Sequence, residues 1–392
     1  MRLFDNTQNA YQIKSNNELN RSYWLFRLVS NPGLVRFGRK AINLALQLHF
    51  PISALFKSTV FKQFCAGEKQ KDSINVINRL SDFNIFSYLH YAVEGEEEEE
   101  EFEISLKKTL ESFHFSKINS SLPFVVFKPT AYGRISLFEK VSSGLTLSVS
   151  EEKEWERVKN RFIKSAEKAV ATNIRLLIDA EESWLQPAID DLAEMLMQRY
   201  NIEKPLIHNT LQMYRLDRLD YLKDLLQKGS AHKYKIGIKL VRGAYIEKEN
   251  HRALSFGLPS PICSSKAATD ENFDAALLLS LKEINWVSLF IGSHNEESLY
   301  KTLAFVAENN ISKTHPNLWF SQLYGMSDHI TFNLADQGYQ TVKYLPYGPI
   351  KEVIPYLIRR AEENTSVSGQ TGRELELIIK EQKRRKLVRA ER

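Results

Sequence analysis

From about residue 85 onward, short apolar runs alternate eight times with longer amphipathic stretches. The runs are continuously apolar, which is typical of strands that are buried on both faces. Eight strand-then-helix units in one series predict a closed (β/α)8 barrel, with a doubly wound sheet as the alternative. The strands are expected at 85–93, 124–128, 174–179, 206–212, 236–241, 288–293, 318–323 and 341–346, and the helices near 101–116, 151–172, 183–200, 215–228, 266–284, 296–310, 327–337 and 349–364.

Helical periodicity dominates the chain before the first predicted strand. Helices are predicted at 19–29, 34–50 and 53–64, followed by a polar connection. We therefore expect an N-terminal helical region at 1–80, a barrel at 81–365 and a basic helical tail at 366–392. The tail contains Lys383-Arg384-Arg385-Lys386. It is interpreted as a solvated terminal helix, with contact to an anionic membrane surface as the alternative.

Composition excludes several classes of protein. With only two cysteines in 392 residues, a disulfide scaffold is excluded and a reducing compartment such as the cytoplasm is favoured. No Cys/His cluster predicts a metal site, and a net charge of +5 gives no indication of nucleic-acid binding. No apolar run approaches the roughly 20 residues of a spanning helix. The basic N-terminal stretch leaves a mitochondrial transit role open, although Asp5 and Glu18 argue against it. The absence of any Gly-X-Gly removes the Rossmann and kinase glycine loops.

Polar or charged side chains recur where the predicted strands end. Active sites of (β/α)8 barrels are built from the carboxyl ends of the strands. One polar residue there would be unremarkable, but stability alone does not explain so many, so a functional site is predicted at this rim. These residues are Lys128, Asp179, Gln212, Lys239, Arg242, His294, Gln322 and Tyr344.

The helix predicted after the eighth strand carries two adjacent arginines, Arg359 and Arg360. Spacings of three and four residues place them on one side of the helix with Tyr356 and Glu363. Because guanidinium groups match carboxylates bidentately, this cluster suits a small ligand that carries a carboxylate. The alternative is a solvated helix with an intrahelical ion pair.

Six consecutive glutamates, residues 96–101, follow the first predicted strand. Like charges repel one another, so this stretch is expected to be a solvated, mobile loop. Its position beside the rim would allow one glutamate to reach the site.

With these strand ends in view, the chain resembles the proline dehydrogenase family of flavin-dependent enzymes. The joint order and spacing of the motifs is specific, whereas each motif alone is weak, and the helical N-terminus is similar to the single-function members. The matching segments are Phe127-Lys128, Ile178-Asp179-Ala180-Glu181-Glu182, Gln212-Met213-Tyr214, Lys239-Leu240-Val241-Arg242-Gly243-Ala244-Tyr245, Ser293-His294-Asn295, Gln322-Leu323-Tyr324-Gly325-Met326 and the closing Tyr344, Tyr356, Arg359-Arg360 and Glu363-Asn364.

The resemblance implies a role for each matching residue. Arg359 and Arg360 would hold the carboxylate of L-proline, Lys128 would add a cation nearby, and Leu240, Tyr245, Tyr344 and Tyr356 would pack around the ring. FAD contacts are implied for Gln212, Val241, Arg242, Gly243, Ala244, Thr269, Ser293, His294, Asn295, Gln322 and Glu363. Asp179 would lie near flavin and substrate, and Lys239 near the reactive flavin nitrogen, where many bacterial members carry arginine. Glu96 would pair with Arg359 and close the site.

The implied reaction is FAD-dependent oxidation of L-proline to Δ1-pyrroline-5-carboxylate in proline catabolism, with a membrane quinone as electron acceptor. The resemblance also implies two interactions. The product would be transferred to a pyrroline-5-carboxylate dehydrogenase, and the protein would contact the inner membrane peripherally. A hydroxyproline dehydrogenase is one alternative, and the aromatic ring of Tyr344 argues against it. A catalytically silent, amino-acid-binding barrel that serves as an interaction protein is the other.

Taken one at a time, several of these residues also have other interpretations. Lys128 could be a Schiff-base lysine, and Tyr344 could fill the top of the barrel. Asn295 could cap a helix. Asp179, Glu181 and Glu182 could be first-turn acids favoured by a helix dipole.

Overall fold

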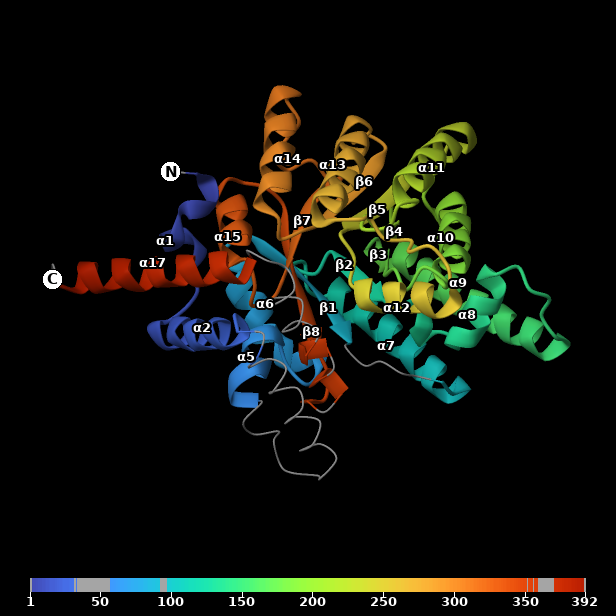
Figure 1. The fold of residues 1–392 in the computed structure, drawn as a ribbon, viewed down its shortest axis with the longest axis horizontal. Helices are drawn as coiled ribbons and strands as arrows, with labels where there is room; N and C mark the ends of the chain where they lie inside the picture. The colour runs from blue at the N-terminus through green and yellow to red at the C-terminus, as the bar shows by residue number, and fades with distance from the viewer. Residues whose placement is uncertain are drawn as a thin grey trace. The chain divides into compact units, whose positions relative to one another are not determined.

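The structure is a computed structural model, and it describes residues 2–31, 33, 57–91, 97–350, 352–354, 356–358 and 370–390. The described strands form one sheet in the order β1-β8-β7-β6-β5-β4-β3-β2, and helices alternate with them along the chain (Figure 1). A doubly wound sheet would reverse its strand order at one point, so that alternative is wrong and the predicted (β/α)8 barrel is confirmed. The strands are β1 (Ile85–Tyr91), β2 (Phe124–Phe127), β3 (Arg175–Ile178), β4 (Ile207–Gln212), β5 (Ile236–Val241), β6 (Val287–Gly292), β7 (Leu318–Leu323) and β8 (Thr341–Tyr347).

Burial explains why these segments are strands. Every residue of β2, β4 and β8 is buried, as expected when both faces of a parallel sheet are covered. β1 and β8 pair in parallel register from Ile85 opposite Thr341 to Tyr91 opposite Tyr347. β2 to β6 also pair in parallel register with one another. Parallel pairing brings the carboxyl ends of neighbouring strands to the same edge of the sheet.

The chain forms two compact units. The terminal unit comprises residues 1–93 and 321–392, and the central unit comprises residues 94–320. The three-part division by chain order at residues 80 and 365 stays a prediction.

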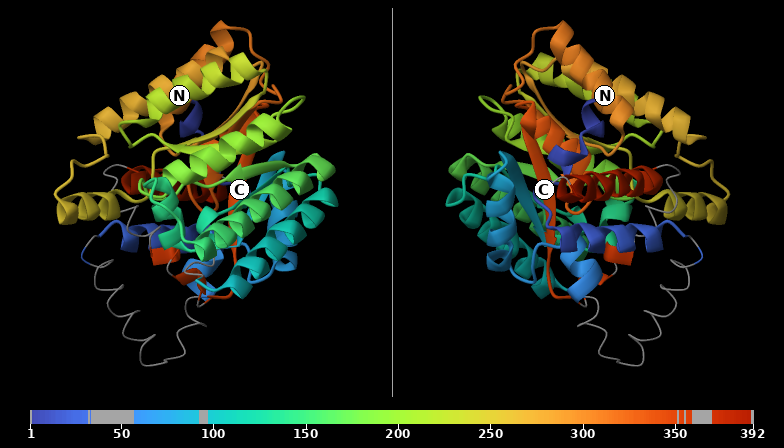
Figure 2. Two further views of the ribbon diagram at one scale, coloured as in Figure 1. Left: turned by 90° about the vertical axis from the view of Figure 1, so that its right-hand side faces the viewer. Right: turned by 90° about the vertical axis from the view of Figure 1, so that its left-hand side faces the viewer.

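In the central unit, α7, α9, α10, α11 and α13 pack against strands β2 to β6 (Figures 1 and 2). The sequence prediction missed α8 and α12, two short helices inserted between a strand and the helix that covers it. The helices of this unit are α7 (Glu99–Lys117), α8 (Ile135–Ser142), α9 (Val149–Thr172), α10 (Gln186–Tyr200), α11 (Arg218–His232), α12 (Ile246–Phe256), α13 (Lys266–Lys282) and α14 (Glu296–Glu308), with the 3-10 turn η4 (Pro129–Ala131).

In the terminal unit, α17 packs along α1 and α2 (Figure 1). The region interpreted as a polar connection contains α6, which buries Ile77 and Leu80 on one face. Of the predicted helices, 34–50 lies outside the described residues, and half of 349–364 does: residues 351, 355 and 359–364. The helices and turns are η1 (Leu3–Asp5), α1 (Thr7–Ala10), α2 (Asn16–Val29), η2 (Lys57–Phe61), α5 (Lys62–Phe64), η3 (Gln70–Ser73), α6 (Ile74–Ser81), α15 (Asp328–Asp336) and α17 (Gln370–Ala390).

The basic tail is not simply a solvated helix. In α17, Arg385 donates to the carbonyl oxygens of Tyr11 and Lys14 at 2.8 and 2.9 Å. Both Arg384 and Arg385 bind Glu381, whose side chain is fully buried. Arg384 also donates to the side-chain oxygen of Gln8 at 3.3 Å, so half of the basic tetrad anchors the tail to the N-terminal segment. Lys383 and Lys386 are the exposed members of the tetrad.

Candidate functional site

In the central unit, the predicted rim residues come from one edge of the sheet. Lys128 follows β2, Asp179 follows β3 and Gln212 ends β4. Lys239 lies in β5, and Ser293 directly follows β6. Since these strands pair in parallel, the structure brings this part of the predicted set together.

A buried ion pair joins two of the strands. Lys239 Nζ lies 2.6 Å from Asp179 Oδ1, and the two side chains are 9% and 18% exposed. The Asp179 backbone N–H donates to the carbonyl oxygen of Phe127 at 3.1 Å, which fixes the position of the acid. Because little water reaches the pair, its attraction is stronger than that of a surface pair. Each charge therefore holds the other in place at the edge of the sheet.

Gln212 connects the loops that follow β3 and β5. Its Nε2 donates to the carbonyl oxygen of Glu181 at 2.7 Å, and its Oε1 accepts from the backbone N–H of Ala244 at 3.3 Å. Gly243 has φ +128°, and a Cβ there would lie 2.3 Å from the ring of Tyr214. Glycine is therefore required in this turn, for its backbone conformation and for the close approach of the tyrosine.

Sequence reasoning missed the role of Glu181. Its carboxylate is buried, and it accepts from the hydroxyl of Thr130 at 2.7 Å and from that of Tyr245 at 3.1 Å. Burial raises the pKa of Glu181, while the charge of Lys128 opposes this shift. The first-turn interpretation of these acids is wrong, because α10 begins only at Gln186. Glu181 instead orients Tyr245 and lies beside Lys128.

Arg242 uses its whole guanidinium within the protein. It donates from Nε to Asp270 at 2.7 Å, from one terminal nitrogen to Ser293 at 2.9 Å and from the other to Ser298 at 2.8 Å. The same group stacks 4.2 Å from the centre of the Phe273 ring. Arg242 therefore ties the end of β5 to the first turns of α13 and α14.

The capping interpretation of Asn295 is confirmed. Its side-chain oxygen accepts from the backbone N–H groups of Glu297 and Ser298 at 2.9 and 3.2 Å, at the start of α14. Its amide nitrogen also donates to Asp270 at 3.2 Å, so the cap belongs to the Arg242 network.

The remaining predicted residues of this unit are placed as follows. Leu240 is fully buried in β5, Val241 is the last residue of β5, and His294 directly precedes the Asn295 cap. Thr269, in α13, donates to the carbonyl oxygen of Ser265 at 3.2 Å.

In the terminal unit, Tyr344 is held by three aromatic neighbours. Its hydroxyl lies 2.7 Å from Nδ1 of His90, and the two rings stack with centroids 5.4 Å apart. Tyr88 makes an edge contact at 5.2 Å, and Tyr356 lies tilted at 6.3 Å. Sequence reasoning missed His90 and Tyr88, which become visible only once β1 pairs with β8 in register.

Gln322 lies in β7, where its side-chain oxygen accepts from the hydroxyl of Thr331 at 2.8 Å and is buried. Four predicted site residues lie outside the described residues, and their placement stays a prediction: Glu96, Arg359, Arg360 and Glu363.

The expectation of a uniformly solvated acidic loop is wrong for the second half of the run. α7 begins at Glu99, and the Glu99 carboxylate binds Arg157 at 2.6 Å and also the buried Arg161. Glu101 accepts from the backbone N–H groups of Glu97 and Glu98 at 2.8 and 3.1 Å, which lowers the pKa of its carboxyl. Two of the six glutamates therefore start and anchor a helix.

In the described part of the chain, no helix is long and apolar enough to span a bilayer.

Comparisons with known proteins agree with these motifs. The family model for proline dehydrogenase matches residues 73–373. The carbapenem antibiotics biosynthesis protein CarD of Pectobacterium carotovorum is 34% identical over 86% of this chain and 86% of its own length. Proline dehydrogenase 1, mitochondrial, of Dictyostelium discoideum is 32% identical over 97% of this chain and 74% of its own. Hydroxyproline dehydrogenase of Xenopus laevis is 30% identical over 96% of this chain and 89% of its own.

Among solved structures, proline utilization A from Bdellovibrio bacteriovorus, inactivated by N-propargylglycine, matches with a TM-score of 0.73 at 21% identity. The match covers 96% of this chain and 41% of that one, so this chain spans about two fifths of that protein, and the likeness supports the barrel fold. The motifs at the strand ends, the family model and the relatives agree: the chain belongs to the proline dehydrogenase family of oxidoreductases.

Proposed function

We infer that this chain is a FAD-dependent dehydrogenase that oxidises L-proline to Δ1-pyrroline-5-carboxylate. The observation that carries the proposal is the set of cations, amides and hydroxyls at the carboxyl ends of β2 to β6. To each member we assign the cofactor or substrate contact that the resemblance to the family implies. The Lys239–Asp179 ion pair is the clearest part of that set.

The residues present fit a flavin. Gln212 contributes an amide, Ser293 and Thr269 contribute hydroxyls, and Lys239 and Arg242 contribute cations that are already paired with Asp179 and Asp270. These groups match the carbonyls, ring nitrogens and phosphates of FAD, and Val241, Gly243, Ala244, His294, Asn295, Gln322 and Glu363 complete the proposed contacts. When bound, FAD would supply the acceptor for the two electrons removed from the substrate.

For the substrate, we assign the carboxylate to Arg359, Arg360 and Lys128, because guanidinium forks and a nearby ammonium match its two oxygens. Leu240, Tyr245, Tyr344 and Tyr356 pack around the ring. The orientation of Tyr245 by Glu181 and that of Tyr344 by His90 support this assignment. Oxidation removes a hydride from the ring CH2 carbon next to nitrogen, which does not bear the carboxylate, and a proton from the nitrogen, leaving a C=N bond between those two atoms. The protein's contribution is to hold the carboxylate at one point so that this carbon has a single position.

Tyr344 favours proline over 4-hydroxyproline. Its ring contacts Tyr88, His90 and Tyr356, so it has little freedom to move away from a bulkier ligand. The hydroxyproline dehydrogenase of Xenopus laevis is a relative, and this aromatic cluster is the feature that we expect to separate the two activities.

Four assignments rest on the family resemblance: Glu96 as a gate that pairs with Arg359, a quinone as electron acceptor, transfer of the product to a pyrroline-5-carboxylate dehydrogenase, and peripheral contact of a cytoplasmic or mitochondrial enzyme with the inner membrane. The gate is tested by comparing Glu96→Ala with Glu100→Ala. Glu100 is the proper control, because it is exposed, whereas Glu99 and Glu101 anchor α7. Only Glu96→Ala should lower kcat/KM, and equal losses would reject the gate.

The experiment that tests the function is anaerobic mixing of the purified, flavin-loaded protein with L-proline. The flavin absorbance band should bleach. If the band persists at saturating proline while a chemical reductant removes it, the proposal fails and a silent binding protein is favoured.

Arg359→Met or Arg360→Met should raise KM for proline by about 10- to 100-fold, the equivalent of a charge-assisted hydrogen bond of ~1.5–3 kcal/mol.

A further inference from the structure

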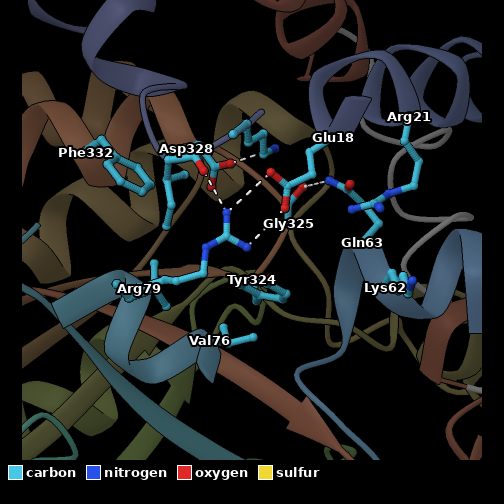
Figure 3. Close-up of a pocket in the computed structure, with 13 residues that line it drawn as sticks. Glu18, Arg21, Lys62, Gln63, Val76, Arg79, Tyr324, Gly325, Asp328 and Phe332 are labelled. Carbon is cyan, nitrogen blue, oxygen red and sulfur yellow. Dashed lines mark hydrogen bonds and ion pairs between the residues drawn. The ribbon is translucent and has the colours of Figure 1, made fainter. Parts of the chain in front are cut away.

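A second charged hollow lies wholly within the terminal unit, and none of the rim residues predicted from the sequence lines it (Figure 3). Its walls come from the segment before α2, from α2, α5 and α6, from the loop between β7 and α15, and from α15 itself. Its empty volume is about 480 Å³, part of which is open solvent. Four cationic side chains line it against two carboxylates.

Both carboxylates are already neutralised. Glu18 pairs with Arg79 at 3.0 Å, and Arg79 also donates to the carbonyl oxygen of Ile13 at 2.7 Å. Asp328 is buried and has Lys14 at 2.8 Å and Lys343 at 2.9 Å. Among the lining residues that the structure describes, the acids therefore leave no negative charge to balance the other two cations.

Those two cations are Arg21 of α2 and Lys62 of α5. Among the residues that the structure describes, neither makes a hydrogen bond or an ion pair, and Nε of Arg21 is buried without an acceptor. A buried guanidinium N–H without an acceptor costs free energy. The lining also includes Tyr324, whose side chain carries a hydroxyl donor. Burial raises the pKa of Tyr324 to about 12, so this hydroxyl stays a hydrogen-bond donor at neutral pH.

We propose that this hollow binds a small oxyanion of the carboxylate or phosphate class, with Arg21, Lys62 and Tyr324 as its donors. Two cations that have no acceptor among the described residues, together with a neutral hydroxyl, form a set of donors that an oxyanion satisfies and a cation does not. A hydrogen bond holds two walls of the hollow together: the Gln63 side chain of α5 donates to the carbonyl oxygen of Gly325, in the loop after β7, at 2.8 Å. Gly325 has φ +79°, and a Cβ there would lie 2.0 Å from the Gln63 carbonyl oxygen, so this contact requires glycine.

The test is thermal unfolding of the full-length, flavin-loaded protein in inorganic phosphate, in acetate, and in chloride at matched ionic strength. A ligand that binds the folded state raises Tm in a saturable manner, so phosphate or acetate should raise Tm above the chloride value. The better of the two identifies the class of anion. Arg21→Gln and Lys62→Gln should each remove roughly half or more of that increase, since each deletes one cationic donor.

Lys71→Gln is the matched control, because Lys71 is an exposed lysine of the same unit that does not line the hollow. It removes the same charge and should leave the anion-dependent increase in Tm unchanged. Phosphate can also bind Arg359 and Arg360, which we assign to the substrate carboxylate. The decisive quantity is therefore the difference in the anion-dependent increase in Tm between Lys62→Gln and Lys71→Gln. Lys62 is exposed, and its substitution keeps the fold even if Arg21→Gln does not. No saturable shift above chloride, or equal shifts in Lys62→Gln and Lys71→Gln, would overturn the proposal. Because the readout is stability, it stands apart from proline oxidation.

Discussion

Replacing Asp328 by asparagine should strongly destabilise the protein, because this carboxylate holds two lysines in the interior. Asp328 is 4% exposed and contacts Lys14 at 2.8 Å and Lys343 at 2.9 Å. The Lys343 side chain is fully buried, so it cannot turn to water when its partner is neutralised. Removing one member of a buried ion pair costs about 3–5 kcal/mol, because the remaining charge stays uncompensated.

The lower end of that range is expected. Lys343 keeps the carbonyl oxygens of Leu323 and Met326, at 3.3 and 2.6 Å, and Lys14 is 11% exposed and can move toward solvent. We therefore expect a loss of about 3 kcal/mol in the free energy of unfolding, measured by urea titration. Asp220→Asn is the control, because Asp220 pairs with Lys223 at 2.7 Å but is 80% exposed. Equal losses in the two variants would refute the reasoning.

Acid should remove the difference between Asp328→Asn and the unchanged protein. Burial alone would raise the pKa of Asp328, but Lys14 and Lys343 outweigh burial and hold this pKa well below its usual range. A depressed carboxyl pKa stabilises the folded state above the unfolded pKa of about 4, and this stabilisation is lost as the pH falls toward the folded value. The difference in unfolding free energy should thus be constant between pH 5 and 7 and shrink below about pH 4.

Three further variants test the rim and the specificity. Glu181→Gln should raise Tm more at pH 8 than at pH 5, because burial raises the pKa of Glu181 and ionising it opposes folding as the pH rises; equal shifts would contradict this. Arg242→Lys keeps the charge but loses the fork that binds Asp270 and Ser293, so the purified protein should carry less flavin per chain by absorbance. Tyr344→Ser should raise the ratio of hydroxyproline to proline turnover, and an unchanged ratio in a flavin-loaded variant would count against the assignment of Tyr344.

The fold was predictable because its signal repeats. Eight continuous apolar runs are long enough to mark buried strands, and the polar residues that end them follow directly from where a strand stops. The short helices α6, α8 and α12 were missed because two or three turns of helix give few periodic positions. α6, for example, buries only Ile77 and Leu80.

The contacts of each site residue were less predictable, because they join residues that are distant in sequence. Glu181 and Tyr245 are 64 positions apart and meet only through the parallel pairing of the strands that precede them. Charge runs were also misleading: Glu99 and Arg385 stand in blocks of like charge, yet each has a specific buried or half-buried partner. A block of charge predicts solvation on average, but it does not show which member is used in packing.

The contact between His90 and Tyr344 is the clearest example of a site contact that joins residues distant in sequence, and it can be tested directly. The Tyr344 hydroxyl lies 2.7 Å from His90 Nδ1, and the imidazole stacks on the Tyr344 ring. Replacing His90 by leucine removes a hydrogen bond worth about 0.5–1.5 kcal/mol and frees the tyrosine ring. The ratio of hydroxyproline to proline turnover should then rise by about 2- to 10-fold, by the conversion of 1.4 kcal/mol per factor of ten. Tyr344→Phe loses the same bond but keeps the stacked ring, so its ratio should stay closer to that of the unchanged protein. If His90→Leu leaves the ratio unchanged in a flavin-loaded protein, the orientation of Tyr344 does not set the specificity.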